Sequence, residues 1–385
     1  MLISPGPLLR RARAGVFALG VLGTPVCASA AAVPAPPPTP SAPPAAQAQR
    51  LAFAERYRAL QHGGIVRAAN ASISCRTAGA LASSSCPAVR AGSAAANGGF
   101  DMFYVDVDRD PNTYNSSRAA VRLPAGSRVT YARLYWGGNL RVGEQKPPRD
   151  NGRVLIAEPG GAYKAVLADT VVGHRAAAGA DAFQASADVT KLVRDSGSGL
   201  YTVAQVNVAM GRSAAGAWGG WTLVVAYAHP DRPLRHLALW DGFDTLKSPA
   251  GRVIRLRGLR VPVRGAGQAG LVTYNGDRGR TGDSLTLSTG LGPPTALADT
   301  ANPRDDVLNS TISGPGAAPG ERTPAYVNTL GYDSDVFDLG NALRRGGDQL
   351  AFRLVSQRDA AWAGALFVAL DAQHQARSRL SRAST

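Results

Sequence analysis

The stretch that decides the fold is WGGWTLVVAYAHPDRPLRHLALWDGFD, residues 218–244. It holds two apolar runs, residues 223–227 and 237–240, on either side of the proline-flanked segment 229–233. β-Branched and aromatic residues favour strands, whereas proline and aspartate between two apolar runs favour a turn. We therefore expect this stretch to form a buried β-hairpin or a Greek-key corner.

The composition extends this expectation to the rest of the chain. Among the 385 residues are 44 Gly and 26 Pro, spaced at short intervals, as in proteins built from many short strands joined by turns. In residues 127–138, Val129 and Tyr135 share one face of a strand, while Leu134 and Trp136 share the other. Both faces are partly apolar, as expected inside a sandwich. The sequence predicts an all-β fold, an antiparallel β-sandwich of the jelly-roll or Greek-key type.

Two short helices are expected within this β-rich chain. Residues 188–194 begin with an acid, carry apolar residues at helical spacing and end with Arg194, which suits the charges at the two ends of a helix. Residues 51–60, LAFAERYRAL, also place apolar residues near helical spacing. They predict a short helix packed on the edge of the domain.

The first 30 residues have the organisation of a secretory signal peptide. Arginines within residues 10–13 precede an apolar segment, residues 14–26, and Ala28-Ser29-Ala30 supplies the small residues of a cleavage site. Residues 31–49 are rich in proline and alanine, a composition that favours an extended linker. We expect a secreted protein, extracellular or at the cell surface, and leave open general secretory or twin-arginine export.

Cysteine usage agrees with export. Cys27 lies in the predicted signal peptide, which leaves Cys75 and Cys86 as an even pair. Such a pair in an exported protein predicts a disulfide, worth roughly 3 kcal/mol on the chain-entropy account. We assign it to an N-terminal extension, residues 50–96, that precedes the ordered body.

The ordered body is expected to begin near Asn97 and to consist of two β-rich halves. These are residues 97–248 and 249–371, followed by a polar, basic tail over residues 372–385 that we expect to be disordered. A single large β-domain is the alternative.

Three segments carry a resemblance to a known family. They are DVDRDPNTYNSSRAAVRLPAGSRVTYARLYWGG (106–138), GAWGGWTLVVAYAHPDRPLRHLALWDGF (216–243) and LGYDSDVFDL (330–339). In this order they resemble a bacterial family of secreted β-sandwich domains of unknown function, often found at the front of large surface proteins that continue into immunoglobulin-like repeats. The resemblance covers about residues 97–371 and implies a surface or extracellular location and no established activity. Because no repeats or sorting motif follow here, we expect simple secretion.

The charge of the chain bears on its partners. A formal net charge of +15 would suit a polyanion. However, only four of the 42 basic residues are lysine, the arginines are spread along the whole chain, and no basic block is interleaved with aromatic residues. We therefore expect no nucleic-acid partner and, once the signal peptide is removed, no integral membrane span.

The best candidate for a site is an acidic loop after the strand expected at residues 100–105. Asp106, Asp108 and Asp110 alternate along it, and Asn112 follows. Calcium loops surround the cation with oxygen ligands at such alternate positions, although the glycine and glutamate of an EF-hand are replaced here by proline and serine. We predict a structural calcium site at these four residues. The alternative is a strand end followed by an Asp-Pro-Asn turn.

Catalytic motifs have weaker support. Ser213 lies in GRSAA, which is similar to a nucleophile elbow, and His229 or His236 with Asp241 would be its partners, but the glycine-rich sequence that follows does not favour the required helix. The sequence Gly265-Ala-Gly267-Gln-Ala-Gly270 matches a dinucleotide fingerprint, yet a strand rather than a helix is expected after it. We expect no cofactor other than the calcium ion.

The aspartates near the C-terminus are the remaining acids of interest. Asp333, Asp335 and Asp338 are either turn residues or a source of a paired general acid and base. Because no catalytic set is complete, we expect a non-catalytic extracellular module that binds a wall polymer, a glycan or a surface protein through exposed aromatic and arginine side chains on loops. The alternative is a secreted hydrolase acting on a polysaccharide or an ester.

Overall fold

The computed structural model describes residues 46–80, 82–169, 172–246, 251–315 and 321–372. The predicted signal peptide, nearly all of the linker and the tail beyond residue 372 lie outside these residues. Pro44–Thr385 form one compact unit, which is all-β apart from short helices. The two α-helices of the described residues are α1 (Cys86–Arg90) and α2 (Thr190–Ser196). α2 confirms the helix expected near residues 188–194.

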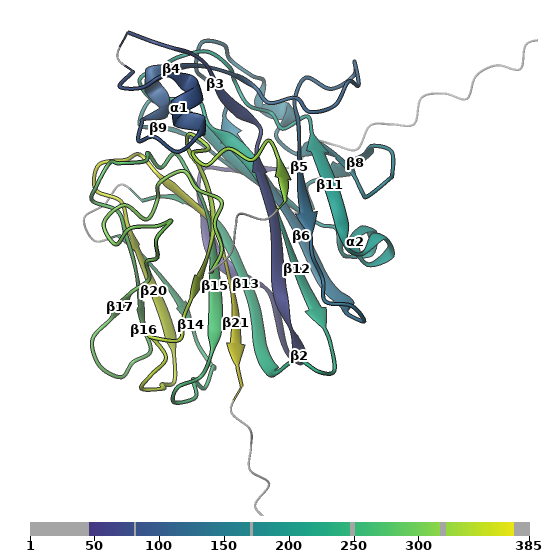
Figure 1. The fold of residues 1–385 in the computed structure, drawn as a ribbon, viewed down its shortest axis with the longest axis vertical. Coiled ribbons are helices and arrows are strands. Elements are labelled where there is room, and N and C mark those ends of the chain that lie inside the picture. Colours follow the sequence, from purple (N-terminus) through teal and green to yellow (C-terminus); the bar gives the residue numbers. More distant parts are fainter. Residues whose placement is uncertain (1–45, 81, 170–171, 247–250, 316–320, 373–385) are drawn as a thin grey trace, which may run out of the picture. The chain divides into compact units, whose positions relative to one another are not determined.

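The strands form two sandwiches that share one ten-stranded sheet (Figure 1). In the first sandwich, the inner strands, in order, are β1 (Gln47–Ala48), β9 (Val172–Ala177), β10 (Ala180–Asp188), β6 (Arg128–Asn139) and β12 (Gly219–Ala228). Its outer sheet, in order, contains β18 (Arg322–Thr323), β5 (Ser116–Val121), β11 (Gly199–Ala204), β7 (Arg153–Ala157) and β8 (Lys164–Leu167). Among the described residues, the strand pairs of these two sheets are antiparallel except for β1 and β9.

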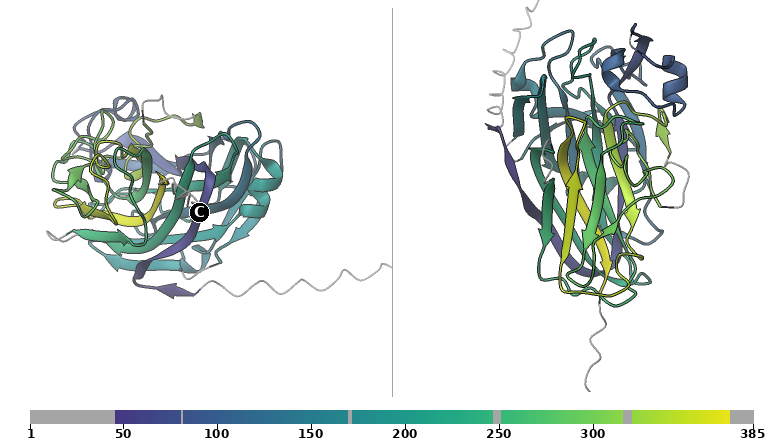
Figure 2. Two further views of the ribbon diagram at one scale, coloured as in Figure 1. Left: turned by 90° about the horizontal axis from the view of Figure 1, so that it is seen from below. Right: turned by 90° about the vertical axis from the view of Figure 1, so that its left-hand side faces the viewer.

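The second sandwich is built mainly from the C-terminal part of the chain. Its inner strands continue the ten-stranded sheet as β13 (Leu234–Thr245), β21 (Trp362–Asp371), β15 (Gly267–Tyr274) and β19 (Tyr332–Asp338). Its outer sheet contains, in order, β14 (Arg252–Leu256), β20 (Leu350–Val355), β16 (Ser284–Ser288) and β17 (Thr295–Ala296). The left view of Figure 2 shows these green and yellow strands beside the teal strands of the first sandwich. The prediction of an antiparallel β-sandwich is confirmed.

A single long strand, β2 (Leu51–Ala71), connects the two sandwiches. Its second part pairs with β12 and its first part with β13, and the change falls between His62 and Gly63. In this ladder Asp241 of β13 lies opposite Ala54 of β2. Tyr135 of β6 lies at the level of Ala69 of β2, on the far side of β12. Even so, the Tyr135 hydroxyl donates a hydrogen bond to the Asp241 carboxylate at 3.1 Å. If β2 were straight, Ala54 and Ala69 would be about 50 Å apart, so β2 must fold back at Gly63.

Gly63 is required by this reversal. Its φ is +151°, and a Cβ there would lie 1.9 Å from the carbonyl oxygen of Tyr227, closer than any real contact. Glycine tolerates both the dihedral and the close approach. The turn between β12 and β13 lies against the same point, because His229 donates its backbone N–H to His62 and Gly63 donates to Pro233.

Three large apolar cores and one small cluster hold the layers of the described residues together. The first, which includes Trp136 and Trp221, fills the space between the outer five-stranded sheet and the inner strands β6 and β12. The second, around Phe352 and Leu366, lies between β20 and β21. The third contains Phe243, stacked on Trp362 at 5.0 Å between ring centroids, together with residues of both inner faces. The two sandwiches are thus packed against each other through an apolar layer.

Four expectations are corrected by this arrangement. Residues 51–60 form part of β2 rather than a helix, because their backbone groups are paired with β13 and tertiary pairing outweighs helix propensity. Residues 50–96 therefore belong to the sandwich and are not an extension before an ordered body. β12 and β13 are not a paired hairpin, since β2 lies between them. The boundary between the halves falls in the turn 229–233 rather than near residue 249.

A small lobe covers one end of the sheets. β3 (Ile73–Ala78) pairs with β4 (Phe100–Tyr104), and α1 packs beside them. The Ser85 hydroxyl caps α1 by accepting the Ala88 N–H at 3.4 Å. A disulfide joins Cys75 on β3 to Cys86 at the start of α1, which confirms the predicted bond.

Removing this disulfide is expected to destabilise the protein by roughly 3 kcal/mol, because the bond closes a short loop and limits the unfolded chain. The change is the double variant Cys75→Ala, Cys86→Ala, and the measurement is urea unfolding with and without reductant. The wild type should lose stability in reductant, whereas the double variant should not respond. An equal midpoint for reduced and oxidised wild type would contradict the expectation.

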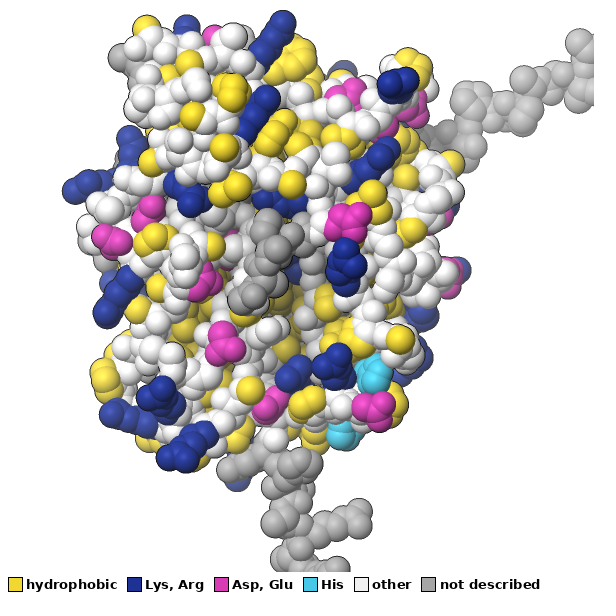
Figure 3. All heavy atoms as spheres, in the orientation of Figure 1, with side chains coloured by type: hydrophobic (Ala, Val, Ile, Leu, Met, Phe, Trp, Pro, Cys, Tyr) yellow, Lys and Arg dark blue, Asp and Glu magenta, His cyan; other side chains and the backbone are white. Residues whose placement is uncertain are grey.

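No helix within the described part of the chain is long and apolar enough to cross a membrane. On the face of the molecule in Figure 3, arginine and lysine side chains are scattered among acids and apolar groups rather than gathered in one block.

Candidate functional site

The acidic loop predicted to bind calcium follows β4 as a chain of turns. The Asp108 carboxylate accepts the Asp110 backbone N–H at 2.9 Å and the Thr113 hydroxyl at 3.1 Å, and Tyr163 donates to its other oxygen. Burial opposes ionisation, but these hydrogen bonds outweigh it and lower the pKa of Asp108.

The other members of the loop are engaged in the same way. The Ser116 hydroxyl donates to Asp106 at 2.6 Å, and the backbone and side-chain amides of Asn112 donate to Asp110 at 2.9 and 2.8 Å. Among the described residues, no group of three histidine, cysteine, aspartate or glutamate side chains is arranged to hold a metal ion. The contacts are those of the alternative turn interpretation, and calcium binding at Asp106, Asp108, Asp110 and Asn112 stays a prediction.

The residues considered for a serine nucleophile do not form a triad in the described part of the chain. The Ser213 hydroxyl is buried and without a hydrogen-bond partner there. His229 contacts the carbonyl of Ala125 at 2.9 Å, and burial together with Arg58 lowers the pKa of His236. Asp241 is paired with arginines between the two sandwiches.

The aspartates of β19 differ in environment. Asp333 and Asp335 are fully buried, and Asp338 is exposed. Asp335 accepts the Thr311 hydroxyl at 3.0 Å and the Ser313 hydroxyl at 2.7 Å. Burial is the main cause that raises the pKa of Asp335 to about 7. Asp333 and Asp335 thus belong to a buried polar network. The glycines at 265–270 lead into β15, as expected, and not into a helix.

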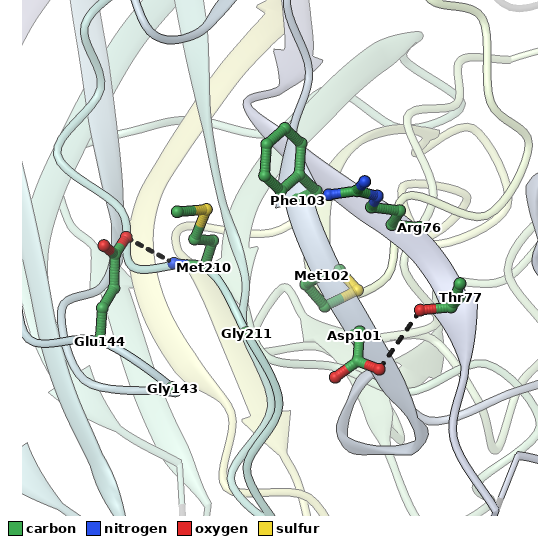
Figure 4. Close-up of a pocket in the computed structure, with 9 residues that line it drawn as sticks. All are labelled: Arg76, Thr77, Asp101, Met102, Phe103, Gly143, Glu144, Met210 and Gly211. Atoms are coloured by element: carbon green, nitrogen blue, oxygen red, sulfur yellow. Dashed lines mark hydrogen bonds between the residues drawn. The ribbon is translucent and has the colours of Figure 1, made fainter.

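The structure places an open cleft of about 630 Å³ beside the small lobe. Its lining combines β3 and β4 of the lobe with two loops of the first sandwich (Figure 4). The lining residues are Arg76, Thr77, Asp101, Met102, Phe103, Gly143, Glu144, Met210 and Gly211.

The floor of the cleft is made by close approach of three backbone segments. Met102 and Gly211 exchange two backbone hydrogen bonds, at 2.8 and 2.9 Å, and Gly143 donates to the Met210 carbonyl at 3.2 Å. Gly211 has a φ of +117°, and a Cβ there would lie 2.7 Å from Gly143 Cα. Only glycine fits at this crossing, so the floor is fixed by backbone contacts.

One wall of the cleft carries an exposed aromatic ring. Phe103 is 41% exposed, and the Arg76 guanidinium lies 4.9 Å from the centre of its ring. The neighbouring Tyr104 and Tyr114 rings are 5.0 Å apart, and the ammonium of Lys146 lies over both. An aromatic and cationic surface of this kind is typical of recognition sites.

The opposite wall carries a fixed carboxylate. Glu144 accepts the Tyr104 hydroxyl at 2.6 Å and the Met210 backbone N–H at 2.9 Å. Burial opposes ionisation, but these hydrogen bonds and nearby Lys146 lower the pKa of Glu144. It is therefore an ionised acceptor at neutral pH, which suits binding rather than proton donation.

A second cavity, of about 480 Å³, lies between the lobe and loops of the second sandwich. Asp277 lines it, and burial followed by the charge of Asp359 raises the pKa of Asp277 to about 7. Both oxygens of Asp277 accept hydrogen bonds, from the Asn97 backbone N–H at 3.0 Å and from Arg280 at 3.2 Å. The Asp277 carboxyl is thus held as an acceptor.

The sequence did not indicate either cavity. Phe103 was placed in a strand, and Arg76, Glu144 and Met210 carried no motif. The one signal in the sequence was Phe103 in FDMFY, an aromatic residue at a position where the alternation of the strand predicts a solvent-facing side chain.

Comparison with known proteins gives little further information. No family model and no curated protein matches the chain. Among solved structures it is similar to one titled as the atomic structure of Sulfolobus Turreted Icosahedral Virus, with 11% identity over 66% of this chain and 86% of that chain, and a TM-score of 0.23. It is also similar to recombinant N-glycanase F, with 13% identity over 69% and 94% of the two chains and a TM-score of 0.22. A third similar structure is that of PNGF-II, with 9% identity over 80% of this chain and 65% of that chain, and a TM-score of 0.22. At these scores the similarities indicate nothing about activity.

Proposed function

We propose that this chain is a secreted, non-catalytic β-sandwich module that binds a glycan of the extracellular space or cell surface in the cleft beside the small lobe. The observation that carries the proposal is the lining of that cleft, where the exposed ring of Phe103 and the side chain of Met210 are flanked by Arg76, Asp101 and Glu144. Apolar surface with a few fixed polar groups is typical of small-molecule sites. A sugar ring offers an apolar face to Phe103 and hydroxyls to the charged groups.

The polar groups of the cleft are positioned before any ligand arrives. Asp101 accepts the Thr77 hydroxyl at 3.2 Å and lies 3.7 Å from Arg212, while Glu144 is held by Tyr104 and Met210. Pre-organised acceptors lower the entropic cost of binding. The fixed backbone floor supports the same conclusion.

A hydrolase is the second candidate, and the raised pKa of Asp277 in its cavity is the observation that favours it. A general acid must donate a proton to the leaving group. Because both oxygens of Asp277 already accept hydrogen bonds, the binding function has the better support.

Replacing Phe103 by alanine is expected to weaken glycan binding about tenfold, a loss of about 1.4 kcal/mol, because the sugar loses its apolar platform. Binding to wall polysaccharides would be measured by pull-down and then by titration of the best polymer. Leu60→Ala is the matched control, since Leu60 is also an exposed apolar residue, 58% exposed, outside the lining of the cleft. The proposal would be contradicted if Phe103→Ala bound the polymer as tightly as Leu60→Ala. It would also be contradicted if the wild type released reducing ends from the polymer.

A further inference from the structure

A third cavity, of about 240 Å³, lies where β2 begins and β13 ends, against β14. Its polar lining includes Arg50, Asp244 and Arg252, and its apolar lining includes Phe53, Trp240 and Ile254. Three separate elements therefore meet at this cavity, and two of them bring arginines to it.

The charges at this cavity are unbalanced. The Asp244 carboxylate, only 6% exposed, is 2.7 Å from Arg50 Nε, 2.5 Å from Arg252 Nη2 and 4.0 Å from Arg175 Nη1. Within the described residues these arginines form ion pairs with Asp244 and with no other acid. One carboxylate thus faces three guanidinium groups, which leaves an excess of positive charge in a partly enclosed space.

One donor in this group has no acceptor. Arg252 Nε is buried and lacks a hydrogen-bond partner in the described part of the chain. A buried donor without an acceptor destabilises the folded state, and the penalty is larger for a charged group. A ligand oxygen at this position would remove the penalty.

We propose that this cavity binds an oxyanion group, a carboxylate or a phosphate, between Arg252 and Arg50. The planar guanidinium matches both groups with paired donors. Phe53 and Trp240 provide apolar surface for the carbon atoms that carry the anion. The site goes beyond the proposed glycan cleft, which contains acids of its own, and it would give the module affinity for acidic extracellular polymers.

The competing interpretation is that the arginines serve only to hold Asp244 in place at the end of β13. Such a cluster would stabilise the fold without taking up an anion. The two interpretations differ in whether anions bind saturably and in whether binding depends on Arg252.

The experiment is a calorimetric titration of the full-length secreted protein with inorganic phosphate and, separately, with glucuronate, each against chloride at equal ionic strength. We expect saturable binding of at least one probe. Binding of phosphate alone would indicate a phosphate polymer, and binding of glucuronate alone a uronic-acid polymer. No binding above the chloride baseline would overturn the proposal.

The variants locate the site. Arg252→Gln should weaken binding at least tenfold, and Arg260→Gln, at an exposed arginine beyond β14, should not change it. If Arg252→Gln fails to fold, Arg50→Gln replaces it, because the Arg50 side chain is 60% exposed. Wild-type affinity in a folded variant at position 252 or 50 would overturn the site. Phe103→Ala should bind phosphate normally, which separates this site from the glycan cleft.

Discussion

Replacing Asp241 by alanine is expected to destabilise the protein by about 3 to 5 kcal/mol, the usual loss when one partner of a buried ion pair is removed. The Asp241 side chain is 4% exposed and lies 2.5 Å from Arg56 and 3.4 Å from Arg133, with the Tyr135 hydroxyl at 3.1 Å. Burial is the largest influence and raises the pKa of Asp241 despite these arginines. Without the carboxylate, Arg56 would lose its ion pair, whereas Arg133 would keep its pair with Asp169.

Urea unfolding at neutral pH, followed by tryptophan fluorescence, would measure this loss. Asp231→Ala is the control, because Asp231 is exposed in the turn between β12 and β13. The control should stay within about 0.5 kcal/mol of the wild type. A loss below about 1 kcal/mol for Asp241→Ala would show that the network does not hold the sandwiches together.

Raising the pH from 5 to 8 is expected to lower the stability of the protein. Burial first, and then neighbouring carboxylates, raise the pKa of Asp277 to about 7 and of Asp283 to about 8, and burial raises that of Asp335 to about 7. In the unfolded chain these groups ionise near 3.8, so their protons favour the folded state. Their contribution is complete below about pH 4 and is lost as the pH rises through 7 to 8.

For each of these aspartates, the free energy of unfolding should fall by about 1.4 kcal/mol for every pH unit over which the group is ionised in the unfolded chain but protonated in the folded one. Urea midpoints measured at pH 5, 6, 7 and 8 test this slope. Asp283 is 1% exposed, and after burial the charge of neighbouring Asp359 is the next influence that raises its pKa. Asp283→Asn should therefore flatten the profile and exceed the wild type in stability at pH 8. A midpoint that is constant or rises with pH would refute this account.

Much of the fold could be predicted from local pattern. The alternation at Val129, Leu134, Tyr135 and Trp136 identified β6, and the pairing of Cys75 with Cys86 followed from counting cysteines. Residues 51–60 were misassigned because Ala, Glu and Arg are good helix formers. The strand partner that overrides this preference, β13, comes far later in the sequence.

The cleft and the cavities could not be predicted in the same way. Arg76, Phe103, Glu144 and Met210 come from four segments, and they meet only because Gly211 crosses Gly143 at a distance that no side chain permits. The acids that sequence patterning did indicate, at 106–110, form consecutive turns. The spacing of residues along the sequence can indicate a site only when all of its residues lie on one strand, helix or loop.

The reversal of β2 has a consequence for how the chain acquires its structure. Arg56 contacts Asp241, 185 residues further on, so β2, the first long strand of the described chain, must wait for most of the molecule before its edges are covered. Contacts between such distant residues slow folding, and an uncovered strand invites pairing with other chains. Fragments that stop before β13 should therefore aggregate, and a chaperone that shields residues 51–71 would help this protein more than one that acts near its C-terminus.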